Sequence, residues 1–191
     1  MSSKSRKQLE SWLKTIDVNC NSVIDIGGSQ NSIKGRIKSW NVNEYKILDL
    51  ENPHEDSRKP DIINDLNEDR YPSIQNANRF DIAFCMEVSE YWFNPLQALR
   101  NIAQYIRRDG ILYISFHFVY NQHPPDKLDY LRYTPNGVNK LLEEAGFVIT
   151  ECKHRLAESD FLEMFYQSEG MRGGKGFNNK VVGSLIKARK L

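Results

Sequence analysis

Glycines placed directly after an apolar run form the first pattern in the sequence that suits ligand binding. Val23–Ile26 is short and apolar, which is typical of a buried strand, and Gly27-Gly28 follows it. Glycines let the backbone turn sharply and bring a ligand close to the main chain. Taken alone, this pair is also consistent with an ordinary turn between a strand and a helix.

Two carboxylates follow at spacings that suit a nucleoside. Asp49, with Leu50 beside it, comes about 20 residues after the glycines, where an acidic residue can accept hydrogen bonds from ribose hydroxyls. Asp65-Leu66 pairs a carboxylate, which can accept from the exocyclic amine of adenine, with an apolar side chain that can pack on the ring. Two alternatives stay open: Asp49 is also suited to cap a helix, and other acidic residues lie close to Asp65. These neighbours are Asp61, Glu68 and Asp69.

Alternation of strands and helices is expected to bring these residues together. Apolar or β-forming runs predict strands at Val23–Ile26, Tyr45–Leu50, Asp61–Leu66, Phe80–Cys85, Ile111–Phe116, Phe147–Cys152 and, near the end of the chain, 180–188. Such alternation favours an α/β fold with a mostly parallel sheet covered by helices on both faces. Ligands of open parallel sheets bind beyond the carboxyl ends of the strands, which is where Gly27, Asp49 and Asp65 are expected.

Helices are predicted from apolar spacing and from end signals. Leu9 and Ile16 belong to one apolar stripe, and a helix is expected over about 31–40. Pro95 begins another helix, with Arg107 and Arg108 in its last turn and Gly110 after it. A further helix starts at Thr134-Pro135 and ends at Gly146.

The order of these motifs resembles that of the class I methyltransferases that use S-adenosylmethionine (SAM). Val23–Gly28 is similar to their first motif, and Phe80–Glu90 to their fourth-strand motif. The segment Leu99–Ile114 is similar to their fifth-strand region, and Tyr130–Phe147 resembles members of the methyltransferase type 11 kind that act on small molecules and glycans. The resemblance covers roughly residues 20–152 and implies a Rossmann-like, doubly wound sheet of seven strands with the last one antiparallel.

The resemblance also implies roles for individual residues. Asp25 and the backbone of Gly27, Gly28 and Ser29 would hold the methionine part of SAM, and Met86 would line the sulfonium region. Asp49 would take the ribose hydroxyls, while Asp65 and Leu66 would bind adenine. Members of the family commonly carry further, alternating glycines in the first motif and a histidine at the place of Tyr91, and this chain departs from both patterns.

A catalytic base is required only where the methyl acceptor is a poor nucleophile. His117, at the end of the fifth predicted strand, is the candidate catalytic residue, although Phe116 and Phe118 beside it also suit a core position. Other candidates follow in the polar segment 121–134, which resembles the lids of methyltransferases acting on sugars. They are His123, Asp126, Arg132 and Tyr133.

Composition limits the class of protein. A formal net charge of +1 gives no global field for nucleic acid, and no aromatic and basic platform stands out. No apolar run is long enough to span a membrane, and no signal peptide is recognised, so a cytoplasmic location is expected. Cys20, Cys85 and Cys152 are too scattered for a disulfide framework, and the histidines show no metal-ligand spacing.

The prediction is therefore one SAM-dependent methyltransferase domain over 1–191, acting on an oxygen or nitrogen of a small molecule or saccharide. It comprises an N-terminal helix (1–19), a cofactor-binding core (20–152), and C-terminal strands with a mobile loop (153–191). A SAM-binding scaffold without activity is one alternative. A nicotinamide-dependent oxidoreductase is another, but Asn31-Ser32 do not supply the glycine that its fingerprint requires.

Overall fold

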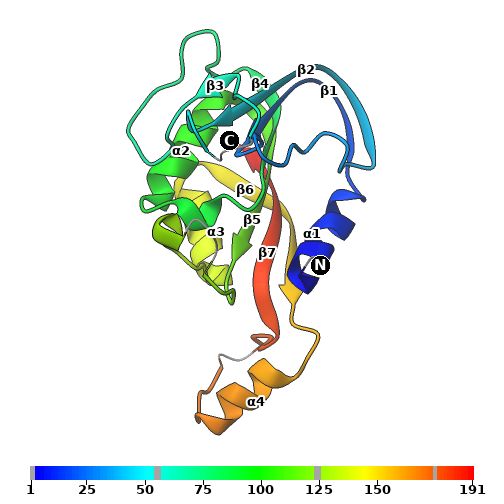
Figure 1. Cartoon of the computed structure of the whole chain (residues 1–191), viewed down its shortest axis with the longest axis vertical. Helices are drawn as coiled ribbons and strands as arrows, with labels where there is room; N and C mark the ends of the chain where they lie inside the picture. The colour runs from blue at the N-terminus through cyan, green and yellow to red at the C-terminus, as the bar shows by residue number, and fades with distance from the viewer. Residues whose placement is uncertain (1–2, 54–56, 123–125, 174–175) are drawn as a thin grey trace.

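The computed structural model describes residues 3–53, 57–122, 126–173 and 176–191. Within them, seven strands form one sheet in the order β3-β2-β1-β4-β5-β7-β6 (Figure 1). All neighbouring pairs are parallel except those of β7, which is antiparallel to β5 and β6. The strands are β1 (Asp17–Ile26), β2 (Ser39–Asp49), β3 (Ile62–Ile63), β4 (Phe80–Cys85), β5 (Ile106–His117), β6 (Phe147–Leu156) and β7 (Val181–Lys190).

Four α-helices accompany the sheet in the described part of the chain. They are α1 (Lys4–Leu13), α2 (Pro95–Tyr105), α3 (Pro135–Glu144) and α4 (Phe161–Ser168); two single 3₁₀ turns are Ser89–Tyr91 and Asp126–Leu128. Helices α2 and α3 cover one face of the sheet, and α1 packs on the other beside β7 (Figure 1). The predicted α/β fold with helices on both faces and an antiparallel last strand is thus confirmed.

The side chains of each strand point alternately to the two faces of the sheet, which divides the core into two layers. In β1, Val23 packs toward α1, whereas Ile24 and Ile26 pack toward α2 and α3, because successive side chains point to opposite faces. Both sides are closely packed: Phe84 stacks on Tyr113 at 4.9 Å between ring centroids on the α1 side. The strand ends are therefore held firmly, and the loops after them are presented at one edge.

Cap signals fix the ends of the helices as expected. The hydroxyl of Thr134 accepts a hydrogen bond from Gly137 N at 3.1 Å, and Pro135 occupies the first turn of α3. Asn94 caps α2 in the same way through Gln97 N. Gly146 ends the α3 segment with φ at +84°, which is a conformation that favours glycine.

The predicted helix over 31–40 is wrong. Residues 27–38 form turns and bends, and β2 already begins at Ser39. Gly35 has φ at +90°, which interrupts a right-handed helix, and Ile33 N donates to the buried carboxylate of Asp25 at 2.7 Å. Ile33 and Ile37 are buried in the core on the α1 side, so tertiary contacts replace the helix.

The boundary after α2 also differs from the prediction. Arg107 and Arg108 do not lie in the last turn of the helix; they belong to β5, because Ile106 already pairs with Phe80 of β4. Arg107 Nε lies 2.6 Å from Asp81 Oδ1, which ties this start of the strand to its neighbour. The register then shifts, and Asp109 at φ +60° marks the irregularity.

Two further differences concern short elements. The third strand spans only Ile62–Ile63 of the predicted 61–66, because β2, on which it pairs, ends at Asp49 opposite Ile63. Helix α4 lies within 153–191, where strands and a loop were expected, and it extends away from the sheet (Figure 1). Residues 174–175, within the C-terminal segment in which a loop was predicted, lie outside the described residues. No helix in the described chain is both long and apolar enough to cross a bilayer.

Candidate active site

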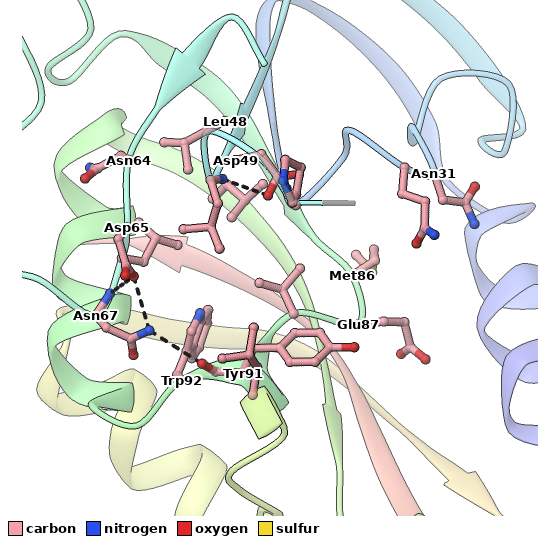
Figure 2. A pocket seen from close by; sticks show the side chains of 18 of the residues that line it. Asn31, Leu48, Asp49, Asn64, Asp65, Asn67, Met86, Glu87, Tyr91 and Trp92 are labelled. Atoms are coloured by element: carbon pink, nitrogen blue, oxygen red, sulfur yellow. Dashed lines mark hydrogen bonds between the residues drawn. The ribbon is translucent and has the colours of Figure 1, made fainter. Parts of the chain in front are cut away.

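A cavity of 330 Å³ lies at the carboxyl ends of β1, β2 and β4 (Figure 2). Its size falls at the lower end of the range for small-molecule sites. Most of the predicted cofactor residues line it, although they are far apart in sequence. These residues are Gly27, Asp49, Leu50, Asp65, Leu66 and Met86.

Asp49, the last residue of β2, is fixed by the loop after β1. Its Oδ2 accepts a hydrogen bond from Ser29 N at 3.1 Å, and its Oδ1 accepts from Leu50 N at 2.9 Å. Each carboxylate oxygen has a second lone pair, which leaves acceptor capacity toward the cavity. Ser29 itself is buried and does not line the cavity, so the structure places it as a support for Asp49.

Asp65 lies in the loop after β3, and Asn67 holds it in place. Asp65 Oδ1 accepts from both Asn67 N at 2.9 Å and Asn67 Nδ2 at 3.2 Å (Figure 2). Asn67 Oδ1 in turn accepts from Phe93 N at 2.9 Å, which joins this loop to the one after β4. Leu66 is buried beside them. A carboxylate and an apolar side chain are therefore presented together, as a purine requires.

Asp25 lies behind the cavity instead of lining it. Its carboxylate is 3% exposed and accepts from Ile33 N at 2.7 Å and from the Tyr45 hydroxyl at 2.6 Å. Burial raises the pKa of Asp25 to about 6, against the opposing effect of these hydrogen bonds. Asp25 holds the loop 27–38 to β1 and β2.

The two glycines of the loop are required by different neighbours. Gly27 has φ at +72°, and a Cβ atom there would collide with Val88. Gly28 does not line the cavity, and its Cβ would collide with the carboxyl group of Asp25. Of the two glycines, only Gly27 lines the cavity.

Several lining residues escaped prediction from sequence. Asn64 is one of them. Its Nδ2 donates to the Tyr105 hydroxyl at 2.8 Å, and its buried Oδ1 has no hydrogen-bond partner in the described part of the chain. Tyr91 and Trp92 form the wall below Asp65 (Figure 2). Asn64 directly follows β3, so its position after a strand could have predicted it as a site residue. Arg6 lies in α1, away from any strand end, so no local sequence pattern predicted that it lines the cavity.

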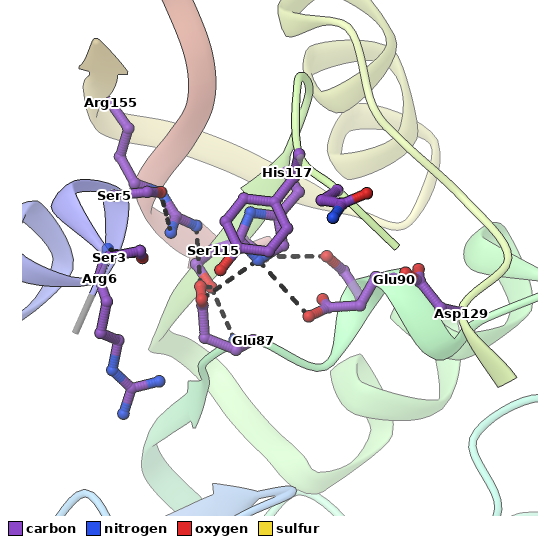
Figure 3. Close-up of polar contacts among 12 residues, drawn as sticks. Ser3, Ser5, Arg6, Glu87, Glu90, Ser115, His117, Asp129 and Arg155 are labelled. Atoms are coloured by element: carbon purple, nitrogen blue, oxygen red, sulfur yellow. Dashed lines mark hydrogen bonds and ion pairs between the residues drawn. The ribbon is translucent and has the colours of Figure 1, made fainter. Parts of the chain in front are cut away.

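His117 lies outside this cavity, in a buried ionic cluster (Figure 3). Its side chain is 1% exposed; Nε2 lies 3.2 Å from Glu87 Oε2 and 3.5 Å from Glu90 Oε1, and its ring stacks on Tyr120. Burial opposes charge on the imidazole, but the two carboxylates raise its pKa above the ordinary value. His117 therefore reaches the cavity only through Glu87, which lines it.

Glu87 is held in a strained backbone conformation by several partners. Its φ is +59°, which is uncommon for a residue with a side chain. Glu87 N donates to Ser115 Oγ at 2.8 Å, and Glu87 Oε1 accepts from Ser115 Oγ at 3.0 Å and from Arg155 Nη2 at 2.8 Å (Figure 3). Burial raises the pKa of Glu87, but His117 and Arg155 outweigh it and hold the pKa well below its ordinary range. Glu87 thus stays ionised at neutral pH.

The other candidate bases are differently placed. The Tyr133 hydroxyl donates to Ser89 O at 2.6 Å within the core, and Arg132 forms a two-point ion pair with Asp129. His123 and the side chain of Asp126 lie outside the described residues. No group of three potential metal ligands occurs in the part of the chain that the structure covers.

Comparison with known proteins supports the resemblance predicted from sequence. Residues 50–114 match the family model described as "Methyltransferase domain". A putative methyltransferase from Bacillus halodurans C-125 is 16% identical and superposes with a TM-score of 0.63 over 95% of this chain and 98% of its own. The chain has the class I methyltransferase fold.

Two further structures share this methyltransferase fold. An S-adenosylmethionine-dependent methyltransferase from Mesorhizobium loti is 14% identical, with a TM-score of 0.63 over 99% of both chains. The 1,6-didemethyltoxoflavin-N1-methyltransferase of Burkholderia thailandensis, solved with bound 1,6-didemethyltoxoflavin and S-adenosylhomocysteine, is 15% identical. Its TM-score is 0.61 over 97% of this chain and 78% of that one. No curated protein matches the chain. At these identities, the structures establish the fold alone.

Proposed function

We propose that this protein is a SAM-dependent methyltransferase that transfers a methyl group to an oxygen or nitrogen of a small molecule. The observation that carries the proposal is the convergence of Asp49, Asp65-Leu66 and Met86 on one cavity beside Gly27. These residues come from four separate segments, and each matches a role that the family resemblance implies. The match of residues 50–114 to a methyltransferase domain supports the same conclusion.

The residues of the cavity fit the nucleoside part of SAM. We assign the ribose hydroxyls to Asp49 and the adenine amine to Asp65, with Leu66 against the ring. The unpartnered Oδ1 of Asn64 offers a further acceptor at the same place. Bound SAM would supply a methyl group already activated by a sulfonium centre, so the protein has mainly to position the acceptor and exclude water.

We infer that the acceptor is a small molecule and name a sugar or glycan intermediate as its class. Phe93 and Tyr130 both line the cavity and are both exposed, and their rings lie edge to face with 6.0 Å between centroids. An aromatic rim of this kind suits the apolar face of a sugar ring. The resemblance of segment 121–134 to the lids of sugar methyltransferases supports the same class. A cytoplasmic location stays a prediction.

A direct catalytic role of His117 also stays a prediction. Because its ring is closed off by Glu87, Glu90 and Tyr120, it would act on an acceptor only through Glu87. The raised pKa of His117 favours its protonated form, which is the wrong state for a base. A poor nucleophile such as a sugar hydroxyl would therefore need a base other than His117.

One structural feature argues against the oxidoreductase alternative. Dinucleotide sites place the pyrophosphate at the N-terminus of the helix after the first strand, but residues 27–38 form no helix. The competing proposal is a SAM-binding scaffold without activity. Methyl transfer from SAM to an acceptor would distinguish the enzyme from the scaffold.

The direct test is titration calorimetry of the purified chain with S-adenosylhomocysteine and, separately, with NAD. We expect binding of the first and none of the second. NAD binding without S-adenosylhomocysteine binding would overturn the proposal. Mass spectrometry of the freshly purified protein for retained SAM is an independent measurement.

A further inference from the structure

A second cavity of 550 Å³ adjoins the first, and the two share Arg6, Asn31, Arg36 and Glu87. The second cavity lies between α1 and the loop 27–38. Its remaining lining residues are Ser3, Glu10 and Tyr120. Asn31 and Glu87 lie on the side of the first cavity opposite Asp65 (Figure 2), so the shared residues mark a second, strongly polar end of that cavity.

Two guanidinium groups meet a single carboxylate at this end. Glu10 Oε1 accepts from Arg6 Nε at 2.9 Å and from Arg36 Nη2 at 2.8 Å, and Arg36 Nε lies 3.2 Å from Glu10 Oε2. One negative charge thus holds two positive ones. Among the contacts of the described chain, Arg6 uses only Nε, so its two terminal nitrogens remain available as donors.

The local backbone explains why cations are needed here. In open α/β sheets, an anionic group of the ligand commonly rests on the N-terminus of the helix that follows the first strand. This chain has no helix between β1 and β2. Asp25, which precedes the loop, is buried, and its carboxylate already accepts hydrogen bonds from Ile33 N and the Tyr45 hydroxyl. Positive charge at this end of the cavity comes instead from Arg6 and Arg36.

A carboxylate stands beside the two cations. Glu87 lines both cavities and is kept ionised by Arg155 and His117. Figure 3 shows Arg6 and Glu87 extending from α1 and from the loop after β4 into the same region. Two guanidiniums with one nearby carboxylate complement the carboxylate and ammonium groups of a free α-amino acid.

We propose that Arg6 and Arg36, held in place by Glu10, bind the α-carboxylate of the methionine part of the cofactor, and that Glu87 binds its α-ammonium group. This inference rests on the proposed function. It transfers the methionine site from Asp25 and the glycine backbone, where the family resemblance put it, to side chains from α1, the loop 27–38 and the loop after β4.

The test compares two ligands that differ by the amino-acid part. Calorimetry would measure the Kd of S-adenosylhomocysteine and of 5′-methylthioadenosine, which lacks the α-carboxylate and α-ammonium, for the wild type, Arg6→Gln, Arg36→Gln and Glu87→Gln. Each variant is expected to bind S-adenosylhomocysteine about tenfold to a hundredfold more weakly, since a charge-assisted hydrogen bond is lost. The affinity for 5′-methylthioadenosine should change less than about twofold.

Arg79→Gln is the matched control, because Arg79 also pairs with a glutamate, Glu44, but lies away from both cavities. Equal affinity of Arg6→Gln and the wild type for S-adenosylhomocysteine would overturn the inference. An equal loss for both ligands would also overturn it, since the effect would then not depend on the amino-acid part. A wild type that binds neither ligand would instead refute the proposed function.

Discussion

Arg155 Nη2 lies 2.8 Å from Glu87 Oε1, and the Arg155 side chain is completely buried. This pair joins β6 to the loop after β4, across the end of β5. Arg155 Nη1 also donates to Ser5 Oγ at 3.1 Å, so the same guanidinium anchors α1. One buried ion pair thus connects three segments that surround the proposed methionine site.

Replacing Arg155 by methionine is expected to destabilise the protein by about 3–5 kcal/mol, because the buried carboxylate of Glu87 would lose one of the two cations that face it. Urea unfolding followed by circular dichroism measures this change. The double variant Arg155→Met/Glu87→Gln should recover part of the loss, since the uncompensated charge is removed as well. Losses that simply add would contradict the assigned pairing.

The His117–Glu87 contact predicts a pH window of stability. The raised pKa of His117 stabilises the fold below pH 6.5, the usual histidine value, and this contribution disappears as the pH rises through the folded pKa. The lowered pKa of Glu87 contributes above pH 4.5 and is lost as the pH falls through its folded pKa. The contact is therefore worth most at about pH 5 to 6.

His117→Gln measures this window directly. The difference in melting temperature between wild type and His117→Gln should be largest at about pH 5 to 6 and should decrease by about pH 9. In a Glu87→Gln background the same substitution should have a smaller pH dependence, because a carboxylate that raises the pKa is gone. A difference that grows toward alkaline pH would have the wrong sign for this cluster.

Asp49→Ala is expected to weaken binding of S-adenosylhomocysteine by at least about tenfold, through loss of charge-assisted hydrogen bonds to the ribose. Calorimetry at one fixed salt concentration provides the measurement. Asp69→Ala is a suitable control, since Asp69 is an exposed acid that accepts from Gln97 at 3.3 Å and does not line the cavity. Equal affinities of the two variants would remove Asp49 from the site.

Gly27→Ala and Gly35→Ala form a matched pair. Both glycines have positive φ, +72° and +90°, so either alanine should cost about 1–2 kcal/mol of stability. A Cβ at Gly27 would also collide with Val88 at the cavity wall, whereas one at Gly35 would meet open space. Ligand binding should therefore fall only in Gly27→Ala. Binding that falls in both variants would show that loop strain, not the cavity wall, is responsible.

Local signals in the sequence predicted the strand ends that carry the site. Ile26 and Cys85 end their strands as predicted, and β2 ends at Asp49, one residue before the predicted Leu50, because apolar runs followed by glycine or polar residues determine where a buried strand stops. The caps at Thr134 and Gly146 were predictable for the same reason. These ends were sufficient to place the nucleoside part of the site.

Long-range partners caused the errors. The helix expected over 31–40 is interrupted at Gly35, whose φ is +90°, and the loop is held instead by Asp25, which accepts from Ile33 N, a contact that has no local signature. Arg155 belongs to the site through Glu87, which lies 68 residues earlier in the chain. Helix α4 has no buried residue among its described positions, so no core-facing stripe marked it. In the first two of these segments the structure depends on contacts between residues far apart in the sequence, which local patterns do not predict.

The connection between β1 and β2 also determines where the molecule opens most easily. A helix would join its amides into one cooperative ladder, but here the amides of residues 28–38 depend on scattered acceptors, such as Ile16 O for Lys38 N. Segments of this kind exchange their amide hydrogens through small openings, while the central strands exchange only on large-scale unfolding. The amides of this loop are therefore expected to exchange faster than those of the strands beside it.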